Sequence, residues 1–465
     1  TEEQNTIVRL IDYNTPKNNT YRAINQWTVI DYETRRPDIV IFINGIPLVV
    51  VELKSPSREE TDASEAYLQI RNYIADIPSL FVYNAFCILS DQSESKVGTI
   101  TADEDRYMEW KTVDGKYENN SLAAFDTLFL GMLEKRRILE LLKHYICYSE
   151  DKKILAGYHQ YFGVKRAIDS VSKASFTDGK GGVFWHTQGS GKSLSMVFFA
   201  KSIQDTIENP TLVIITDRND LDGQLFGQFA KCAPFLRQTP ENAESRKDLR
   251  DRLLGRKANG IIFTTMQKFE EYDTPLSERR NIIVIADEAH RGQSRLEERI
   301  DEKTGRIKVG TARKIRNSLP NATYIGFTGT PIFKADRNTQ EIFGNYIDIY
   351  DMTQSVDDGA TRPIYYESRV VNIKLDPAVL AALDERYGIV AEKVPEYVVD
   401  KSKKDLGNLE SILGAPETID SLCQDIITHY EENRASILTG KALIVAYSRS
   451  IAIKIYSRIL ELRPG

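Results

Sequence analysis

The stretch from Gly182 to Ser193 constrains the fold of this chain more than any other. It is a short apolar run followed by a glycine-rich loop, and then by Lys192 and Ser193 at the start of a helix-like sequence. Glycines free a backbone from Cβ clashes, so the N–H groups of such a loop can surround phosphate oxygens at the positive end of the next helix. The pattern predicts a strand, a phosphate-binding loop and a helix, with room for a nucleoside triphosphate.

Within this loop we expect Lys192 to reach the β and γ phosphates and the Ser193 hydroxyl to ligate Mg²⁺. The complete set of predicted nucleotide-binding residues in the loop is Thr187, Gly189, Ser190, Gly191, Lys192 and Ser193. The pattern G-x-x-x-x-G-K-[ST] is one residue short of a full match, because His186 occupies its first glycine position. The loop alone therefore leaves open an ordinary glycine-rich turn between a strand and a helix.

A second motif lies about a hundred residues further on, where the apolar run 282–286 ends in Asp287 and Glu288. A buried parallel strand delivers functional residues at its carboxyl end. Asp287 is predicted to hold Mg²⁺, and Glu288 to orient and deprotonate an attacking water. Together with the loop, this Asp-Glu-Ala-His sequence resembles the superfamily 2 helicase and translocase motors.

The resemblance to these motors extends upstream and downstream of the two motifs. Gln160 resembles the glutamine that hydrogen-bonds adenine, which favours ATP because an amide matches both a donor and an acceptor on the base; a surface amide on a helix is the alternative. Apolar runs at 211–216, 260–269 and 322–327 alternate with helix-like segments, and this alternation predicts a parallel sheet. The polar ends of these strands are expected to contact a nucleic-acid backbone.

The first 150 residues indicate a separate α+β domain. Strands at 38–43 and 48–54 flank Asn44-Gly45, a strong signal for a two-residue hairpin. Glu52 and Lys54 share one face of the second strand, and burying unpaired charge is costly. A metal site would explain the two charges, with Asp38 and Glu52 ligating Mg²⁺ and Lys54 positioning water. An ion pair on an edge strand remains the alternative.

Gln69 and Tyr73 favour the metal site, because they lie four residues apart on a predicted helix over 63–74 and so share one face. Asp38, Glu52, Lys54, Gln69 and Tyr73 together resemble the active-site motif of PD-(D/E)xK nucleases in their RecB-like branch, and the resemblance implies that all five line a catalytic site. A further core strand is predicted over 80–91, followed by mostly helical structure over 122–147.

Composition limits the setting in which these sites work. Apolar residues make up 41% and charged residues 28% of the 465 positions, as in globular proteins, and the length suggests roughly three domains. The net charge of −6 offers no overall basic field, so any DNA path must be a local groove. Four widely spaced cysteines favour a reducing cytoplasm, and no apolar run approaches the ~20 residues of a membrane span.

The joint pattern closely resembles the restriction and translocation subunit of type I restriction enzymes, truncated at its C-terminal side. The resemblance implies an α/β chain with a PD-(D/E)xK (RecB-like) nuclease domain and helical linker at 1–150, a first RecA-like superfamily 2 domain at 151–367, and the beginning of a second at 368–465. It implies ATP and Mg²⁺ as cofactors, double-stranded DNA as substrate, and docking on modification (methyltransferase) and specificity subunits. Two alternatives remain, a stand-alone helicase–nuclease and a scaffold with degenerate motifs.

Overall fold

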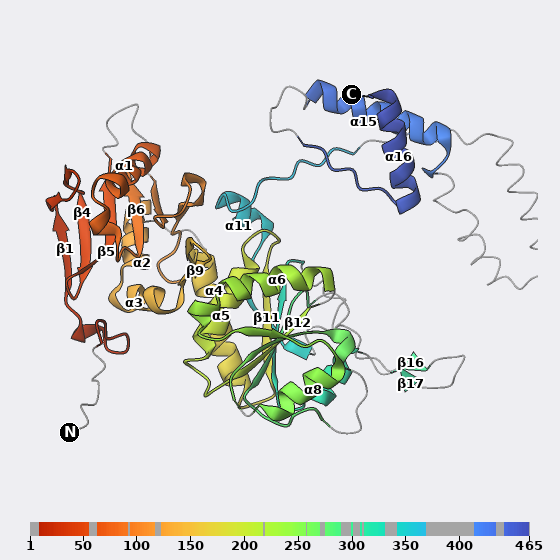
Figure 1. The fold of residues 1–465 in the computed structure, drawn as a ribbon, viewed down its shortest axis with the longest axis horizontal. Helices are drawn as coiled ribbons and strands as arrows, with labels where there is room; N and C mark the ends of the chain where they lie inside the picture. Colours follow the sequence, from red (N-terminus) through yellow and green to blue (C-terminus); the bar gives the residue numbers. More distant parts are fainter. Residues whose placement is uncertain are drawn as a thin grey trace, which may run out of the picture. The chain divides into compact units, whose positions relative to one another are not determined.

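The chain folds into two compact units, Thr1–Pro363 and Ile364–Gly465 (Figure 1). The computed structural model describes residues 9–54, 63–91, 94–116, 122–216, 219–256, 258–269, 275–289, 299–300, 307–308, 311–330, 342–368, 413–433 and 441–464. The fold is mixed α/β. Among the described helices, none combines the length and the hydropathy that a membrane crossing requires.

The N-terminal part of the first unit is built on a mixed six-stranded sheet in the order β1-β4-β5-β6-β7-β8. Only the β5–β6 pair is parallel among these neighbours. The strands are β1 (Tyr21–Asn25), β4 (Ile39–Ile43), β5 (Ile46–Leu53), β6 (Phe86–Ser90), β7 (Ser95–Gly98) and β8 (Met108–Glu109), with a small separate hairpin of β2 (Val29–Ile30) and β3 (Thr34–Arg35).

The hairpin predicted about Asn44-Gly45 is confirmed. Asn44 and Gly45 both have positive φ, at 53° and 83°, which is the backbone of a two-residue turn that matches strand twist. β4 and β5 pair antiparallel on either side of it. The strand predicted over 80–91 is wrong in its first half, because Pro78 begins a short 3₁₀ helix, Pro78–Phe81, and pairing starts only at Phe86.

Helices cover this sheet and lead into the second half of the unit. α1 (Ala63–Asp76) packs through Ile70 and Tyr73 on the β5 face that carries Val50. α2 (Ala124–Met132) and α3 (Lys135–His144) bear out the helical prediction for 122–147. The hairpin of β9 (Ile146–Ser149) and β10 (Lys152–Leu155) then connects to α4 (Tyr158–Ala174).

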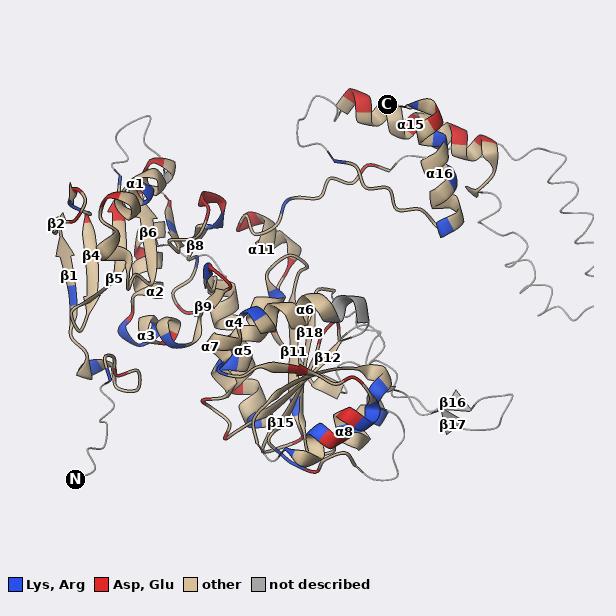
Figure 2. Cartoon of the chain, viewed as in Figure 1, with Lys and Arg blue, Asp and Glu red and all other residues tan. Residues whose placement is uncertain are grey.

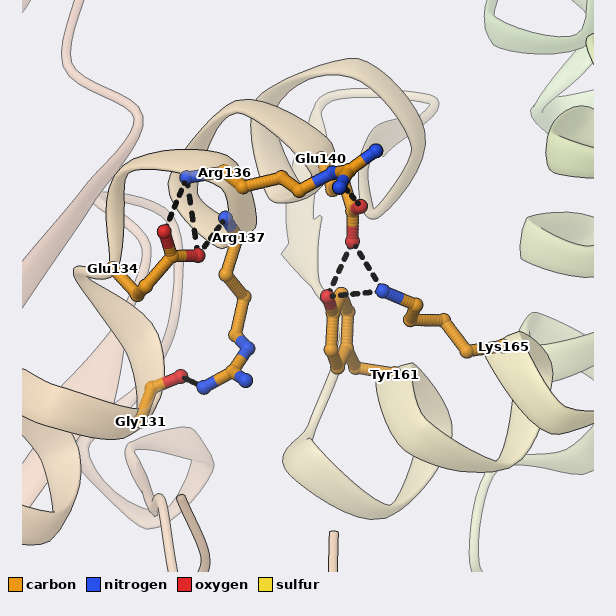
Figure 3. A network of polar contacts seen from close by, with 7 residues as sticks. All are labelled: Gly131, Glu134, Arg136, Arg137, Glu140, Tyr161 and Lys165. Atoms are coloured by element: carbon orange, nitrogen blue, oxygen red, sulfur yellow. Dashed lines mark hydrogen bonds and ion pairs between the residues drawn. The ribbon is translucent and has the colours of Figure 1, made fainter. Parts of the chain in front are cut away.

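α3 and α4 are joined by a network of polar contacts (Figure 3). The Glu140 carboxylate on α3 accepts hydrogen bonds from the Tyr161 hydroxyl and from Lys165 Nζ, the latter at 2.9 Å. These bonds keep the pKa of Glu140 lowered although burial alone would raise it. The Arg137 guanidinium donates to the Gly131 carbonyl and lies over the ring of Tyr161. α4 is therefore fixed to the N-terminal half of the unit.

The second half of the unit is a seven-stranded sheet in the order β13-β14-β12-β15-β18-β11-β19, and every pairing in it is parallel. This confirms the predicted parallel sheet. Its strands are β11 (Lys180–His186), β12 (Thr211–Thr216), β13 (Pro240–Asn242), β14 (Ile261–Thr265), β15 (Ile282–Ala286), β18 (Thr323–Thr328) and β19 (Tyr346–Tyr350). The chain visits them out of order, as crossover connections through helices require.

Helices cover both faces of this sheet (Figure 1). One face packs with α4 and α5 (Lys192–Ile203) and is continuous with the core beneath the N-terminal sheet. The other face packs with α8 (Arg246–Gly255) and α9 (Thr311–Ser318). Because both faces are covered, the strands are near-continuous apolar runs, as the sequence showed. α6 (Asn219–Lys231), α7 (Ala233–Leu236) and α11 (Met352–Asp357) complete the described helices of this half.

The second unit contains two packed helices, α15 (Pro416–Asn433) and α16 (Arg449–Leu462). Ile419 and Cys423 of α15 meet Ile451 and Ile455 of α16 in a small apolar cluster. Residues 441–448 form no strand pairing with any residue that the structure describes.

Candidate functional site

The predicted phosphate loop connects the end of β11 to the start of α5. Gly189 and Gly191 have φ of 90° and 85°, values that glycine adopts without the strain other residues incur. The Thr187 carbonyl accepts hydrogen bonds from the Ser190 amide at 3.3 Å and from its hydroxyl at 2.6 Å. The loop is thereby closed around one turn at the N-terminus of α5, the geometry that suits an anion.

Lys192 and the two acidic residues face one another at this loop. Lys192 Nζ lies 3.4 Å from the Thr187 carbonyl and interacts electrostatically with Glu288 and Asp287. Burial lowers the pKa of Lys192, and the two carboxylates oppose that shift. Ser193 is exposed at the first turn of α5. The structure thus brings together the loop and the acidic pair, which are about a hundred residues apart in sequence.

Asp287 and Glu288 follow directly after β15. Burial, and next the neighbouring Glu288, raise the pKa of Asp287 from 3.8 to about 6, although the Glu288 amide and Lys192 oppose the shift. Glu288 has φ of 47°, a left-handed conformation that costs a residue with a side chain about 1–3 kcal/mol. A strained residue beside a carboxylate with a raised pKa is typical of a catalytic position.

The end of β18 packs against the phosphate loop. A Cβ on Gly329 would lie 2.8 Å from Lys192 Nζ and 3.4 Å from the Gln188 amide nitrogen. The Ala289 amide also donates to the Phe327 carbonyl at 3.0 Å. The end of β18 and the glycine that follows it therefore contact the acidic strand end through Phe327 and the phosphate loop through Gly329.

The first turn of α4 lies against the other side of the loop. Gln160 accepts from the Gly157 amide at 3.0 Å and donates to the Gly191 carbonyl at 3.1 Å. Each end of its amide retains one further donor or acceptor for an adenine edge. The neighbouring His159 is buried, stacks on Tyr350 and lies 3.2 Å from the Ser190 carbonyl.

The raised pKa of Asp287 predicts that its ionised carboxylate lowers the stability of the folded protein at neutral pH. A folded-state pKa above the unfolded value means that the folded protein binds the proton more tightly, so unfolding free energy falls as pH rises from about 4 to about 6. Asp287→Asn should therefore raise the melting temperature at neutral pH in the presence of a chelator. The gain in unfolding free energy should be no more than about 3 kcal/mol, since one pKa unit is about 1.4 kcal/mol. The gain should shrink below about pH 5.

Asp248→Asn is the matched control for this thermal-unfolding measurement. A hydrogen bond from the Glu244 amide, together with Arg252, lowers the pKa of Asp248, so the carboxylate is stabilising above its unfolded pKa. Its loss should lower the melting temperature at neutral pH. If Asp287→Asn also lowered the melting temperature at neutral pH, the prediction that the buried Asp287 carboxylate destabilises the folded protein would be wrong.

A second acidic site lies at the start of β4 and the end of β5, two interior strands of the N-terminal sheet. The antiparallel pairing of β4 with β5 ends at Ile39 and Val51, and Asp38 and Glu52 are the next residues beyond that pair on the two chain segments. Asp38 accepts from the Leu53 amide and from Gln26 Nε2, both at 2.8 Å. Glu52 is only 4% exposed and forms an ion pair with Lys54 at 3.0 Å. Burial raises the pKa of Glu52, Lys54 lowers it, and the nearby Asp38 raises it.

Gln69 and Tyr73 of α1 complete this cluster. Tyr73 is buried and interacts electrostatically with both Glu52 and Asp38, and Gln69 hydrogen-bonds the Tyr73 side chain. Burial, followed by the charge on Glu52, raises the pKa of Tyr73, which keeps it a neutral donor. All five residues predicted for this site are therefore in one cluster. Their catalytic roles remain a prediction.

A divalent cation fits the carboxylates present. Glu52 Oε2 is buried without a hydrogen-bond partner, and Asp38 is close enough for its charge to raise the pKa of Glu52. Oxygen ligands of this kind suit Mg²⁺. Within the described residues no group of three or more His, Cys, Asp or Glu side chains forms a metal cluster, so the protein ligands identified here are these two carboxylates.

Sequence reasoning missed three residues behind the phosphate loop. Asp348 on β19 is buried and contacts His186 and Arg166. Its signal was an acidic residue in the middle of the apolar run Tyr346–Tyr350, a burial that demands a partner. His186 had been noted only as a departure from the expected glycine. Arg166 gave no signal, because its partners are distant in sequence.

A phosphate loop facing an acidic pair across a parallel sheet defines a P-loop ATPase. The family model described as SWI2/SNF2 ATPase matches residues 159–397, which is more than half of the chain. The match includes the loop, the acidic pair and Gln160. Use of ATP by this half of the protein follows from that membership.

The chain belongs to the family of type I restriction enzyme endonuclease subunits. A model of the N terminus of type I restriction enzyme R proteins matches residues 1–106. The type I restriction enzyme HindI endonuclease subunit of Haemophilus influenzae is 40% identical over all of this chain and 45% of its own length. A protein provisionally named the MjaIXP endonuclease subunit, from Methanocaldococcus jannaschii, is 34% identical over 99% of this chain and 45% of its own.

The chain thus spans about half the length of the curated relatives it matches. Among solved structures, a fragment of an HsdR subunit from Vibrio vulnificus YJ016 covers 95% of this chain and 70% of its own, at 15% identity and a TM-score of 0.38.

Proposed function

We propose that this chain provides ATP-dependent translocation of double-stranded DNA and Mg²⁺-dependent endonucleolytic cleavage, as the motor subunit of a type I restriction enzyme. The observation that carries the proposal is the presence of two separate acidic sites in one compact unit, one on each sheet. One contains a phosphate loop and the other does not. Two different phosphate chemistries account for this arrangement.

For the ATPase, residues 151–367 form the first RecA-like domain in this proposal, and residues 368–465 begin a second. Lys192 neutralises phosphate charge, and the loop amides from Gly189 to Ser193 hold the phosphate oxygens. Ser193 and Asp287 would hold Mg²⁺. Glu288, set apart from Asp287 by its left-handed backbone, orients water and accepts its proton. Gln160 and Thr187 complete the site, with the amide of Gln160 presented to adenine.

For the nuclease, residues 1–150 form a PD-(D/E)xK domain with a helical linker. Asp38 and Glu52 would hold Mg²⁺, which when bound neutralises phosphodiester charge and makes water more acidic. Lys54 holds Glu52 by its ion pair and presents an ammonium group to the scissile phosphate. Gln69 contacts the Tyr73 side chain, whose hydroxyl also lies 3.5 Å from the Arg36 carbonyl, so Tyr73 has two polar neighbours besides Glu52.

The substrate and partners follow from the family. Duplex DNA is the proposed substrate. Basic and acidic residues are interspersed along elements such as α8, so we expect the DNA to bind in a local groove and not over a broad basic surface (Figure 2). Methyltransferase and specificity subunits are the proposed partners, and the cytoplasm is the proposed location. A stand-alone helicase–nuclease is the second candidate, which co-purification of the full natural polypeptide with the two partner subunits would exclude.

Displacement of a triplex-forming oligonucleotide from duplex DNA tests the motor assignment. The assembled enzyme should release the third strand when ATP and Mg²⁺ are present, because a translocase strips bound strands from its track. It should release none with a non-hydrolysable ATP analogue. ATP hydrolysis that depends on DNA but leaves the triplex in place would contradict translocation while leaving the ATPase intact.

A further inference from the structure

His186 links the phosphate loop to a buried carboxylate. The ring is fully buried at the end of β11, where the loop begins, and it packs on Phe184 with ring centroids 3.9 Å apart. Its Nε2 lies 2.7 Å from Asp348 Oδ2, and the carboxylate can only accept, so Nε2 carries the proton. Burial lowers the pKa of His186, although Asp348 opposes the shift. The position of His186 is thus set by Asp348.

Asp348 is in turn held by Arg166 of α4. The carboxylate is 4% exposed, and its other oxygen forms an ion pair with the Arg166 guanidinium. Without Arg166 the buried charge of Asp348 would lose this partner, and an uncompensated buried charge is strongly destabilising. β19 also contacts the loop directly, since the Thr187 amide donates to the Tyr350 carbonyl at 2.8 Å.

Arg166 makes a second bond, to the Gly115 carbonyl. Gly115 closes a turn in the 110–116 segment, which continues from β8 at the edge of the N-terminal sheet. Trp110 of the same segment packs against Tyr161 of α4, with ring centroids 5.7 Å apart. Lys111 forms an ion pair with Asp358 at 2.9 Å. The segment is therefore docked at several points on the ATPase half.

We propose that Arg166 is a positioning residue that connects the phosphate loop, through Asp348 and His186, to the 110–116 segment leading out of the N-terminal sheet. Affinity for ATP then depends on whether this segment is docked, and ATP binding in turn stabilises the docked segment, since linkage is reciprocal. The inference rests on the ATP site proposed above. A forked guanidinium bonds two acceptors in a fixed geometry, which an ammonium group does not reproduce.

Arg166→Lys in the full natural polypeptide tests the connection. With DNA and Mg²⁺ present, the KM for ATP should rise about tenfold, within the usual range of coupling between sites. The kcat should change by less than about twofold, because Lys192, Asp287 and Glu288 are untouched. Arg252→Lys is the matched control and should leave both constants unchanged. Arg252 of α8 bridges Asp248 of the same helix and Glu241 of β13, the strand at the opposite edge of the sheet from β11 and β19.

Hydrogen exchange in the unmodified protein provides a measurement that does not depend on any variant folding. ATP with Mg²⁺ should slow amide exchange within 110–116 about tenfold in the wild type and much less in Arg166→Lys. Wild-type protein that binds ATP without slowing exchange at 110–116, or an Arg166→Lys variant with unchanged KM, would overturn the connection. Failure of the wild type to bind ATP at all would instead overturn the proposed function.

Discussion

Replacing Lys192 by alanine is expected to reduce ATP hydrolysis at least about a hundredfold, the effect of removing one preorganised charge from a developing anion. Lys192 lies at the phosphate loop and interacts electrostatically with both Asp287 and Glu288. Its loss removes that positive charge from the site where the phosphates would bind. Translocation, and the cleavage that depends on it, should then be abolished in the assembled enzyme.

Steady-state ATPase and triplex-displacement assays measure this effect, and Lys201→Ala is the matched control. Lys201 lies on the same helix, in its last turn, with its ammonium group over the ring of Phe235. The Lys201→Ala enzyme should hydrolyse ATP at the wild-type rate. A Lys192→Ala enzyme that still displaced the third strand at a normal rate would show that the motor uses a different nucleotide site.

The parallel sheet and the hairpin at Asn44-Gly45 were predictable because each depends on local signals. Strands buried on both faces must be apolar throughout, and a turn with positive φ at two positions selects Asn-Gly. The stretch 80–91 misled because its apolar residues fill the core from a 3₁₀ helix as readily as from a strand. Composition alone does not separate the two.

The sequence predicted which acidic residues belong to each of the two sites, because carboxylates at the ends of strands are easily recognised next to apolar runs. The supporting contacts were not. Arg166, Asp348 and Gly115 come from three separate segments, and only the folded chain places them together. The sequence shows that His186 replaces the first glycine of the loop. The hydrogen bond from His186 to Asp348 could not be predicted, because it depends on where β19 lies in the folded sheet.

Replacing Lys54 by alanine is expected to eliminate DNA cleavage, by at least about a hundredfold, while ATP hydrolysis and translocation continue. Lys54 is the largest of the contacts that offset the burial of Glu52, and its removal leaves Glu52 beside Asp38 without that ion pair. The carboxylate should then take up a proton more readily and hold Mg²⁺ less well. Plasmid cleavage and ATPase assays on the same preparation measure the separation.

Lys96→Ala is the matched control, because it removes the same kind of pair from the same sheet. Lys96 contacts Glu94, two residues earlier, at 2.6 Å, but Glu94 has 49% of its side chain exposed whereas Glu52 has 5%. An exposed pair contributes little, so cutting should be retained. Equal cleavage by Lys54→Ala and Lys96→Ala would mean that the buried pair is structural, and the nuclease site would have to lie elsewhere in the chain.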